Sequence, residues 1–153
     1  MTTLADILPV DRPALLTTAG PEGPRTRPIG IHPDPHGDEG VVAIVTTETT
    51  RKVADIAAQP MVVLSGTTDD GYYAIEARAE RVDDPAAIGR TMAHFLGGAG
   101  TAPADDAAPA EQEQEQDEER PATVLYRLHP TSATLWTVHS PRPFDNDVEN
   151  IAV

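Results

Sequence analysis

Four basic residues in two nearby stretches of the sequence have the types and spacing of an anion-binding site. Arg25 and Arg27 stand two residues apart in RTRPIGI, and Arg51 and Lys52 follow the threonines of VVAIVTTETTRK. Lys52 is the sole lysine of the chain. Guanidinium and ammonium groups hold a phosphate through charge-assisted hydrogen bonds, and Thr50 adds a hydroxyl and an amide.

The residues around these bases predict the elements that position them. The run 41–46 predicts a strand, and Thr49 or Thr50 is expected to cap a helix that ends at Ala58, before Gln59-Pro60. A helix start favours an anion through its free N–H groups and its dipole. The spacing therefore suggests a phosphate site. The alternative, in which threonine caps the helix and the four bases form a solvated edge, stays open at this point.

Patterns along the whole chain predict a mainly β fold, a β-barrel with short helices. Residues 14–19, 26–31 and 41–46 are expected to form an antiparallel meander. Further strands are expected at 61–65, 72–82, 124–128 and 134–138, the last two joined by HPTS. Helices are expected at 4–8, from the threonine cap to Ala58, and at 84–96, while the polar tail from residue 140 is expected to dock loosely.

Hydropathy patterns within these elements predict which faces are buried. In 72–82, Tyr73, Ile75, Ala77 and Ala79 alternate with charged residues, which predicts one buried and one wet face. In the central helix the expected apolar face consists of Val53, Ile56 and Ala57.

Composition limits the class of protein. The 153 residues suit a single domain, and the absence of cysteine excludes disulfides and Cys-based zinc sites. The formal net charge is −14, of which −7 comes from the eight acids and one base of residues 101–120, leaving 17 acids against 10 bases. This acidic balance argues against nucleic-acid binding. No stretch has the length of a membrane helix, so a cytoplasmic protein is expected, with a disordered acidic loop at 98–121 inside one domain, 1–153.

Histidines and other polar residues suggest no second site. His32 and His36 lie in a turn broken by prolines, so their rings need not converge, and no metal site is predicted. No general acid or base stands out, and the catalytic residues stay unknown.

The order of these motifs resembles the pyridoxamine 5′-phosphate oxidase-like split-barrel flavoproteins, and in style the general stress protein 26 branch. The segments that carry the likeness are Arg27-Pro28-Ile29-Gly30, then TTETTRK with its helix and Gln-Pro, then YYAIEARAERVDD and YRLHPTSATLW. The likeness covers residues 4–97 and 122–138.

The resemblance implies a split β-barrel of the FMN-binding type, with the cofactor at a homodimer interface. The phosphate would be held by Arg27, Arg51 and Lys52, with Thr50 as a further donor. The ring would lie against the backbone of Arg27, Pro28, Ile29 and Gly30 and against Val45 and Thr46, and Trp136 would approach the flavin. A deazaflavin in place of FMN is a variant of this implication.

Departures from the family pattern bear on activity. The substrate-gripping Arg-x-His segment of the oxidases is out of register here, at His139 and Arg142, and His32 replaces a flavin-contacting lysine. Pyridoxamine phosphate oxidation is therefore not expected. Two hypotheses stay open: an FMN-dependent oxidoreductase acting on an unknown small molecule, and a non-catalytic stress-response or ligand-binding dimer that holds flavin weakly or not at all.

Overall fold

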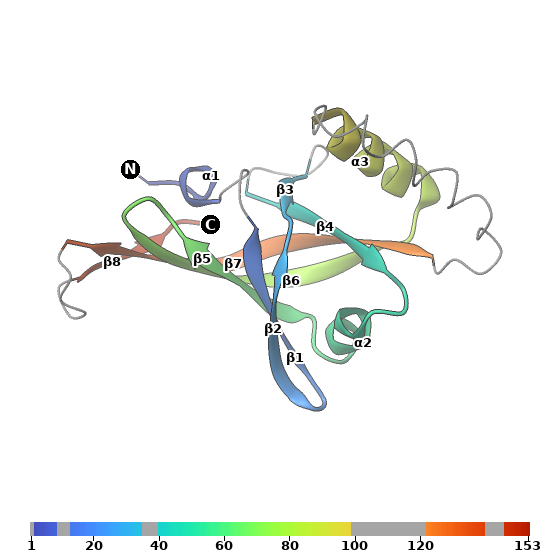
Figure 1. Ribbon diagram of the computed structural model, residues 1–153, viewed down its shortest axis with the longest axis horizontal. Helices are drawn as coiled ribbons and strands as arrows, with labels where there is room; N and C mark the ends of the chain where they lie inside the picture. Colours follow the sequence, from blue (N-terminus) through green and yellow to red (C-terminus); the bar gives the residue numbers. More distant parts are fainter. Residues whose placement is uncertain (1, 9–12, 35–39, 99–121, 140–145) are drawn as a thin grey trace.

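One antiparallel sheet carries the fold (Figure 1). The computed structural model describes residues 2–8, 13–34, 40–98, 122–139 and 146–153. In chain order the elements of these ranges are α1 Leu4–Ile7, β1 Ala14–Gly20, β2 Gly23–Ile29, β3 His32–Pro33, β4 Val42–Thr47, α2 Arg51–Ala58, β5 Met61–Thr67, β6 Gly71–Val82, α3 Pro85–Gly98, β7 Thr123–Val138 and β8 Asn146–Ile151.

The strands follow the order β2-β1-β5-β6-β7-β4-β3, and β8 also pairs with β7. Strand β7 is the centre of this arrangement, because β6 lies along one of its edges and two strands share the other. Strand β4 pairs with residues 123–128 of β7, and β8 pairs with residues 133–138. The predicted mainly β fold, a split barrel with short helices, is confirmed.

Two strand predictions were wrong because the pairing is less local than the sequence suggests. Strands β1 and β2 form the expected hairpin, but β4 pairs with β3 and β7 rather than with β2. The two strands predicted around HPTS are one strand, β7, whose register with β6 shifts at Ala77–Pro130. Proline has no N–H for the ladder, and one unpaired extra residue, Thr131, forms a bulge that lets the strand continue.

The C-terminal tail also contradicts its prediction. Residues Asn146–Ile151 form β8, and Ile151 is 5% exposed within the core. The acidic segment 101–120 and His36 lie outside the described residues, so the predicted disordered loop and the histidine turn stay predictions. The same holds for the single domain over 1–153.

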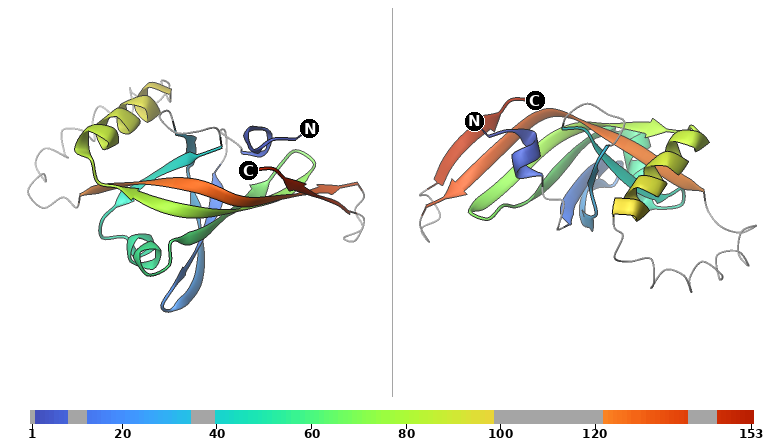
Figure 2. Two further views of the ribbon diagram at one scale, coloured as in Figure 1. Left: turned by 180° about the vertical axis from the view of Figure 1, so that it is seen from behind. Right: turned by 90° about the horizontal axis from the view of Figure 1, so that it is seen from above.

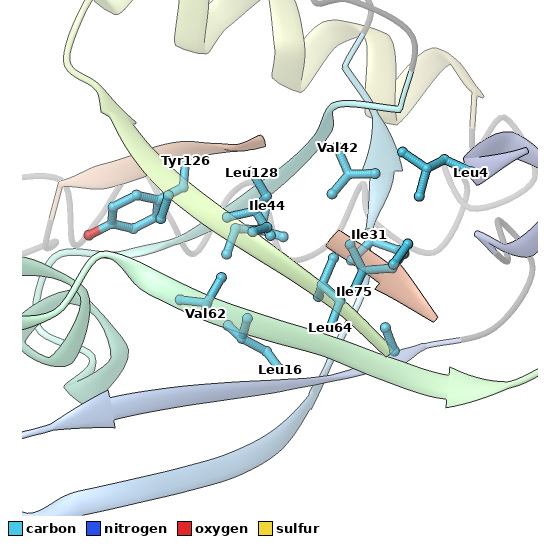
Figure 3. Packing of buried hydrophobic residues seen from close by; sticks show 14 of the residues in the cluster. Leu4, Leu16, Ile31, Val42, Ile44, Val62, Leu64, Ile75, Tyr126 and Leu128 are labelled. Atoms are coloured by element: carbon cyan, nitrogen blue, oxygen red, sulfur yellow. The ribbon is translucent and has the colours of Figure 1, made fainter. Parts of the chain in front are cut away.

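The core is aliphatic, as the composition suggests. Side chains from β1, β5 and β6 face side chains from β4 and β7, and Ile31, the residue before β3, joins the same cluster (Figure 3). In β6 the predicted alternation is confirmed, since Tyr73, Ile75, Ala77 and Ala79 are all buried. The largest fully buried aliphatic residues are Leu16, Ile44, Val62, Leu64, Ile75, Val124, Leu125 and Leu128.

A second, smaller buried layer lies outside this cluster. Ala43 of β4 and Leu125 of β7 alternate away from the main core and are buried, as are Ala87 and Thr91 of α3. Helix α3 contacts β7, and Figure 2 shows α1 and α3 over opposite ends of the sheet. No helix of the described ranges is long and apolar enough to cross a membrane.

Replacement of Leu16 by alanine tests the assigned core. Leu16 is fully buried, whereas its neighbour Leu15 is 42% exposed. Deleting a buried leucine leaves a cavity, so Leu16→Ala is expected to lower the free energy of unfolding by about 3 kcal/mol. Leu15→Ala, the matched control in the same strand, should cost less than about 1 kcal/mol. Urea unfolding followed by circular dichroism measures both, and equal losses would contradict the assigned faces of β1.

Candidate functional site

The candidate site lies where the β1–β2 hairpin meets the start of α2. The hairpin places Thr18 opposite Arg25 and Leu16 opposite Arg27, so both arginines share the face of Leu16 and Thr18, as alternation predicts. Helix α2 packs against β1 on this side of the sheet, and Figure 1 shows α2 beside the hairpin. Packing of α2 therefore brings Lys52 and Asp55 to the same place as Arg27.

A buried carboxylate organises one half of the site. Nη1 of Arg27 donates to the Thr18 hydroxyl at 2.9 Å, and that hydroxyl donates to Oδ2 of Asp55 at 2.8 Å. Nη2 of Arg27 lies 3.5 Å from the same Asp55 oxygen. The Asp55 side chain is 6% exposed and that of Arg27 is 22% exposed. The guanidinium of Arg27 is thus held by a hydroxyl and a carboxylate on its buried side.

A chain of hydroxyls organises the other half. Nζ of Lys52 donates to the Thr46 hydroxyl at 3.0 Å, and the Thr46 and Thr50 hydroxyls lie 3.0 Å apart. The Thr50 hydroxyl donates to the Thr47 carbonyl at 3.0 Å, so Thr46 is the donor to Thr50. Thr50 is the N-cap residue of α2, as expected, but its side chain makes no cap hydrogen bond. The first turn of α2 therefore keeps amide donors without a side-chain partner.

Electrostatics at Lys52 favour an anion. Burial, and then the nearby positive charge of Arg27, lower the pKa of Lys52 from its ordinary value. Among the described residues, no carboxylate oxygen lies within the 4.0 Å of an ion pair with its Nζ. Lys52 is consequently a half-buried cation, placed beside a second cation at the positive end of a helix dipole. A phosphate bound here would relieve that repulsion.

Arg51 and Arg25 are directed to a different partner. Nη2 of Arg51 lies 2.9 Å from Oε2 of Glu22, and Nη2 of Arg25 lies 2.6 Å from the same oxygen. Glu22 belongs to the hairpin turn and is 61% exposed. The structure thus brings together Arg27, Lys52 and Thr50 of the predicted phosphate ligands, whereas Arg51 would have to leave Glu22 to join them.

The residues predicted to line a ring border this cluster along the chain. Pro28 and Gly30 are exposed, and Ile29 is partly buried and packs on the core. Val45 is partly buried next to Thr46 in β4. Pro28, Ile29 and Gly30 directly follow Arg27 in the chain, and Val45 directly precedes Thr46, whose hydroxyl accepts from Lys52.

Trp136 is not brought to the cluster within one chain. Thr46 pairs with Val124 at the start of β7, whereas Trp136 lies 12 positions further along the same strand. At about 3.3 Å per residue, that separation amounts to roughly 40 Å of strand. Figure 1 shows β8 and the adjoining end of β7 at the opposite end of the sheet from α2.

His32 occupies a separate environment beneath α3. Its ring stacks on Phe95 with centroids 4.0 Å apart and an interplanar angle of 25°. Burial, and then the nearby His94, lower the pKa of His32 from its ordinary value. His32 is therefore neutral at pH 7 and anchors α3 rather than facing the cation pair. In the described part of the chain, no three acidic or histidine side chains gather as a metal site would require.

Sequence reasoning missed Thr18 and Asp55. The predicted apolar face of α2 included Ala57, which is exposed, while Asp55 is buried together with Val53 and Ile56. The helix is rotated so that Asp55 lies under the hairpin. One signal was available, because Asp55 directly precedes the core residue Ile56. A charged side chain is rarely buried without a partner, so burial of Asp55 would have indicated a basic or hydroxyl partner nearby.

The family profile described as pyridoxamine 5′-phosphate oxidase matches residues 2–137, which is most of the chain. The chain belongs to the pyridoxamine 5′-phosphate oxidase family. The resemblance stated from the motifs is thereby confirmed at the level of the family. A comparison with curated protein sequences finds no match.

Solved structures of the same fold agree with this family. General Stress Protein 26 from Bacillus anthracis has a TM-score of 0.53 at 16% identity, covering 81% of this chain and 83% of its own. A pyridoxamine 5′-phosphate oxidase-related, FMN binding protein from Nostoc punctiforme reaches 0.56 at 16% identity, with coverages of 93% and 88%. HutZ, a heme storage protein from Vibrio cholerae, reaches 0.52 at 14% identity, with coverages of 78% and 81%. At these identities the likeness shows the fold.

Replacement of Lys52 by methionine tests the electrostatic cost of the site. Because the pKa of Lys52 is lower in the folded protein, its charge opposes folding at every pH below that folded value, and this cost fades as pH rises toward 10.5. Lys52→Met is therefore expected to stabilise the protein at pH 7 by about 0.5 kcal/mol, a value discounted for solvent screening.

The advantage of Lys52→Met should shrink as pH rises toward 10.5 and vanish beyond it, as followed by urea unfolding across pH. Arg90→Met, which removes an exposed cation of α3, is the control and should show no such pH dependence. Destabilisation by Lys52→Met at pH 7 would show that Lys52 is already well compensated.

Proposed function

We propose that this chain is a flavoprotein of its family, holding FMN by its phosphate and acting as a flavin-dependent oxidoreductase on a small molecule. One observation carries the proposal. Arg27 and Lys52 converge beside the uncapped start of α2, where Lys52 has no carboxylate partner among the described residues and its pKa is lowered. Two cations, hydroxyls and helix amides match the chemistry of a phosphate monoester.

Within this proposal, each part of the site has a role toward the cofactor. Arg27 and Lys52 would hold the phosphate, with Thr50 as a donor and Arg51 joining when it exchanges Glu22 for the phosphate. The backbone from Arg27 to Gly30 and from Val45 to Thr46 would adjoin the ring. The bound flavin would supply the hydride chemistry, and the protein would supply binding, orientation and access. The related Nostoc protein, described as FMN binding, supports FMN over the deazaflavin variant.

The proposal includes a cytoplasmic homodimer with the cofactor at its interface. Within one chain Trp136 lies in the half of β7 that pairs with β8, away from the half beside Thr46, so the Trp136 that approaches the flavin would come from a second copy. The outer face of the sheet supports such pairing. Tyr72, Trp136 and Val148 are neighbours across β6, β7 and β8, and Tyr72 and Val148 are 56% and 62% exposed. Exposed apolar side chains in one row are a feature of association surfaces.

A non-catalytic binding role is the second candidate, and the position of His32 favours it. Its neutral ring is stacked on Phe95, so it offers no cation where the oxidases have a flavin-contacting lysine. HutZ, a heme storage protein, has the same fold. In this alternative the dimer holds a ligand without turnover. Pyridoxamine phosphate oxidation itself is not proposed, because the Arg-x-His segment is out of register.

Visible absorption of the purified protein, before and after addition of FMN, tests the flavin proposal. Bands near those of bound FMN are expected to persist through gel filtration. Arg27→Met and Lys52→Met should each weaken FMN binding at least tenfold, because each removes a charge-assisted contact worth roughly 1.5–3 kcal/mol. Arg90→Met is the charge-matched control and should bind as the wild type does.

The outcomes of this titration separate the candidates. A protein that takes up no FMN would overturn the flavoprotein proposal. Tight FMN binding without any reduction by NADH or NADPH, and without turnover of screened acceptors, would favour the non-catalytic role. The absorption maximum of a retained native cofactor distinguishes FMN from a deazaflavin.

Fluorescence of Trp136, the one tryptophan of the chain, tests the shared site. If the partner subunit places Trp136 near the flavin, FMN should quench most of its emission. Dilution below the dimer dissociation constant should restore the emission, because a site completed by the partner subunit loses its flavin when the dimer separates. Light scattering at each concentration gives the oligomeric state. Quenching that persists in a monomer would contradict the shared site.

A further inference from the structure

We propose that Asp55 is a positioning residue of the phosphate site and sets the orientation of the Arg27 guanidinium before any ligand arrives. This inference rests on the proposed function, since it assigns a role at the same site. It concerns a residue that neither the motifs nor the family likeness singled out. Asp55 lies on α2 beneath the hairpin and points away from solvent.

The contacts of Asp55 are those of a support rather than of a ligand. Its side chain is 6% exposed, its Oδ2 accepts from Thr18, and the same oxygen lies 3.5 Å from Nη2 of Arg27. Thr18 is itself fully buried and accepts from Nη1 of Arg27. Both terminal nitrogens of the guanidinium are therefore engaged on one side. Nε and the remaining protons of the fork are left to bind a phosphate.

The hairpin backbone is built around this carboxylate. A Cβ atom at Gly20 would clash with the carboxylate of Asp55, so any other residue at this position would displace that carboxylate. Gly20 has no positive φ, which makes space rather than backbone conformation the reason for glycine here. Thr18, Gly20 and Arg27, from two adjacent strands, thus all meet Asp55.

Charge alone does not account for an acidic residue at this place. Asp55 cancels part of the positive charge of Arg27 and Lys52, so a site that merely attracted anions would bind a phosphate better without it. Orientation gives the opposite expectation. A free arginine side chain has many rotamers, and holding it in one of them removes an entropic cost from ligand binding. The two explanations therefore predict opposite signs for the neutral variant.

The test is titration of wild type and Asp55→Asn with FMN, followed by flavin fluorescence. We expect Asp55→Asn to bind FMN about tenfold more weakly, within the usual range for coupled neighbours. Equal or tighter binding would overturn the proposal and assign Asp55 to charge balance alone. The same substitution in an Arg27→Met background should cause no further loss. An equal loss in both backgrounds would mean that Asp55 acts through the fold and not through Arg27.

Two further variants distinguish the effect of where the Asp55 carboxylate lies from the effects of its charge and of protein stability. Gly20→Ala keeps every charge but displaces the carboxylate, so it should also weaken FMN binding. Asp34→Asn is the matched control, because Asp34 is also a buried acid, with its Oδ2 2.6 Å from Nε of Arg127. It should lower stability without changing FMN affinity. A similar loss of affinity in Asp34→Asn would also overturn the proposal.

A measurement without flavin keeps the inference independent of the proposed function. In the nuclear magnetic resonance spectrum of the ligand-free protein, the Nη–Hη signal of Arg27 should be resolved and protected from exchange, because Nη1 donates to Thr18 and Nη2 lies beside Asp55. Asp55→Asn should collapse that signal toward the position of exposed arginines. If the wild type binds no FMN, the flavoprotein proposal fails, while this signal still decides whether Asp55 orients Arg27. An unchanged signal would overturn the inference.

Discussion

The pairing of β7 is the constraint on which the rest of the structure depends. One edge of this strand pairs with β6 between residues 125 and 137, while the other edge is divided between β4 and β8. The irregularity opposite Ala77 separates the two halves. Strand β4 pairs with the first half of β7, and this pairing fixes where β4 ends and therefore where α2 begins. The second half of β7 pairs with β8 and extends the sheet away from α2. Trp136 lies in this second half.

The site combines one charge that opposes folding with polar contacts that compensate it in part. Lys52 is half-buried beside Arg27 at the start of a helix, where a cation is unfavourable. Thr46 and Thr18 hold the two cations through hydroxyl groups, and Asp55 compensates one of them. Polar groups buried in this manner persist only when each has a partner. A site that retains an uncompensated charge is typical of binding surfaces rather than of structural ion pairs such as Asp34–Arg127.

Local patterns predicted the elements, and non-local contacts decided the rest. The alternation in β6 and the stop at Gln59-Pro60 depend on neighbouring residues, so the sequence predicts them well. The place of β4 in the sheet depends on β7, which follows about 80 residues later, and no local pattern reports that pairing. Pro130 suggested a turn, because a bulge in an internal strand has the same signal as a break. The convergence of Arg27 and Lys52 was predictable from alternation and from a helix start, whereas burial of Asp55 depended on the rotation of α2.

The environment of Lys52 also favours its neutral, nucleophilic form. An amine whose pKa is lowered has a larger neutral fraction at mildly alkaline pH, and the neutral form is the one that attacks acylating reagents. Since no other lysine exists in the chain, the α-amino group is the sole competing amine. The α-amino group ordinarily has the lower pKa of the two amines. Acylation therefore reports on Lys52 when the two products are resolved, and an anion between Lys52 and Arg27 would slow the reaction at Lys52.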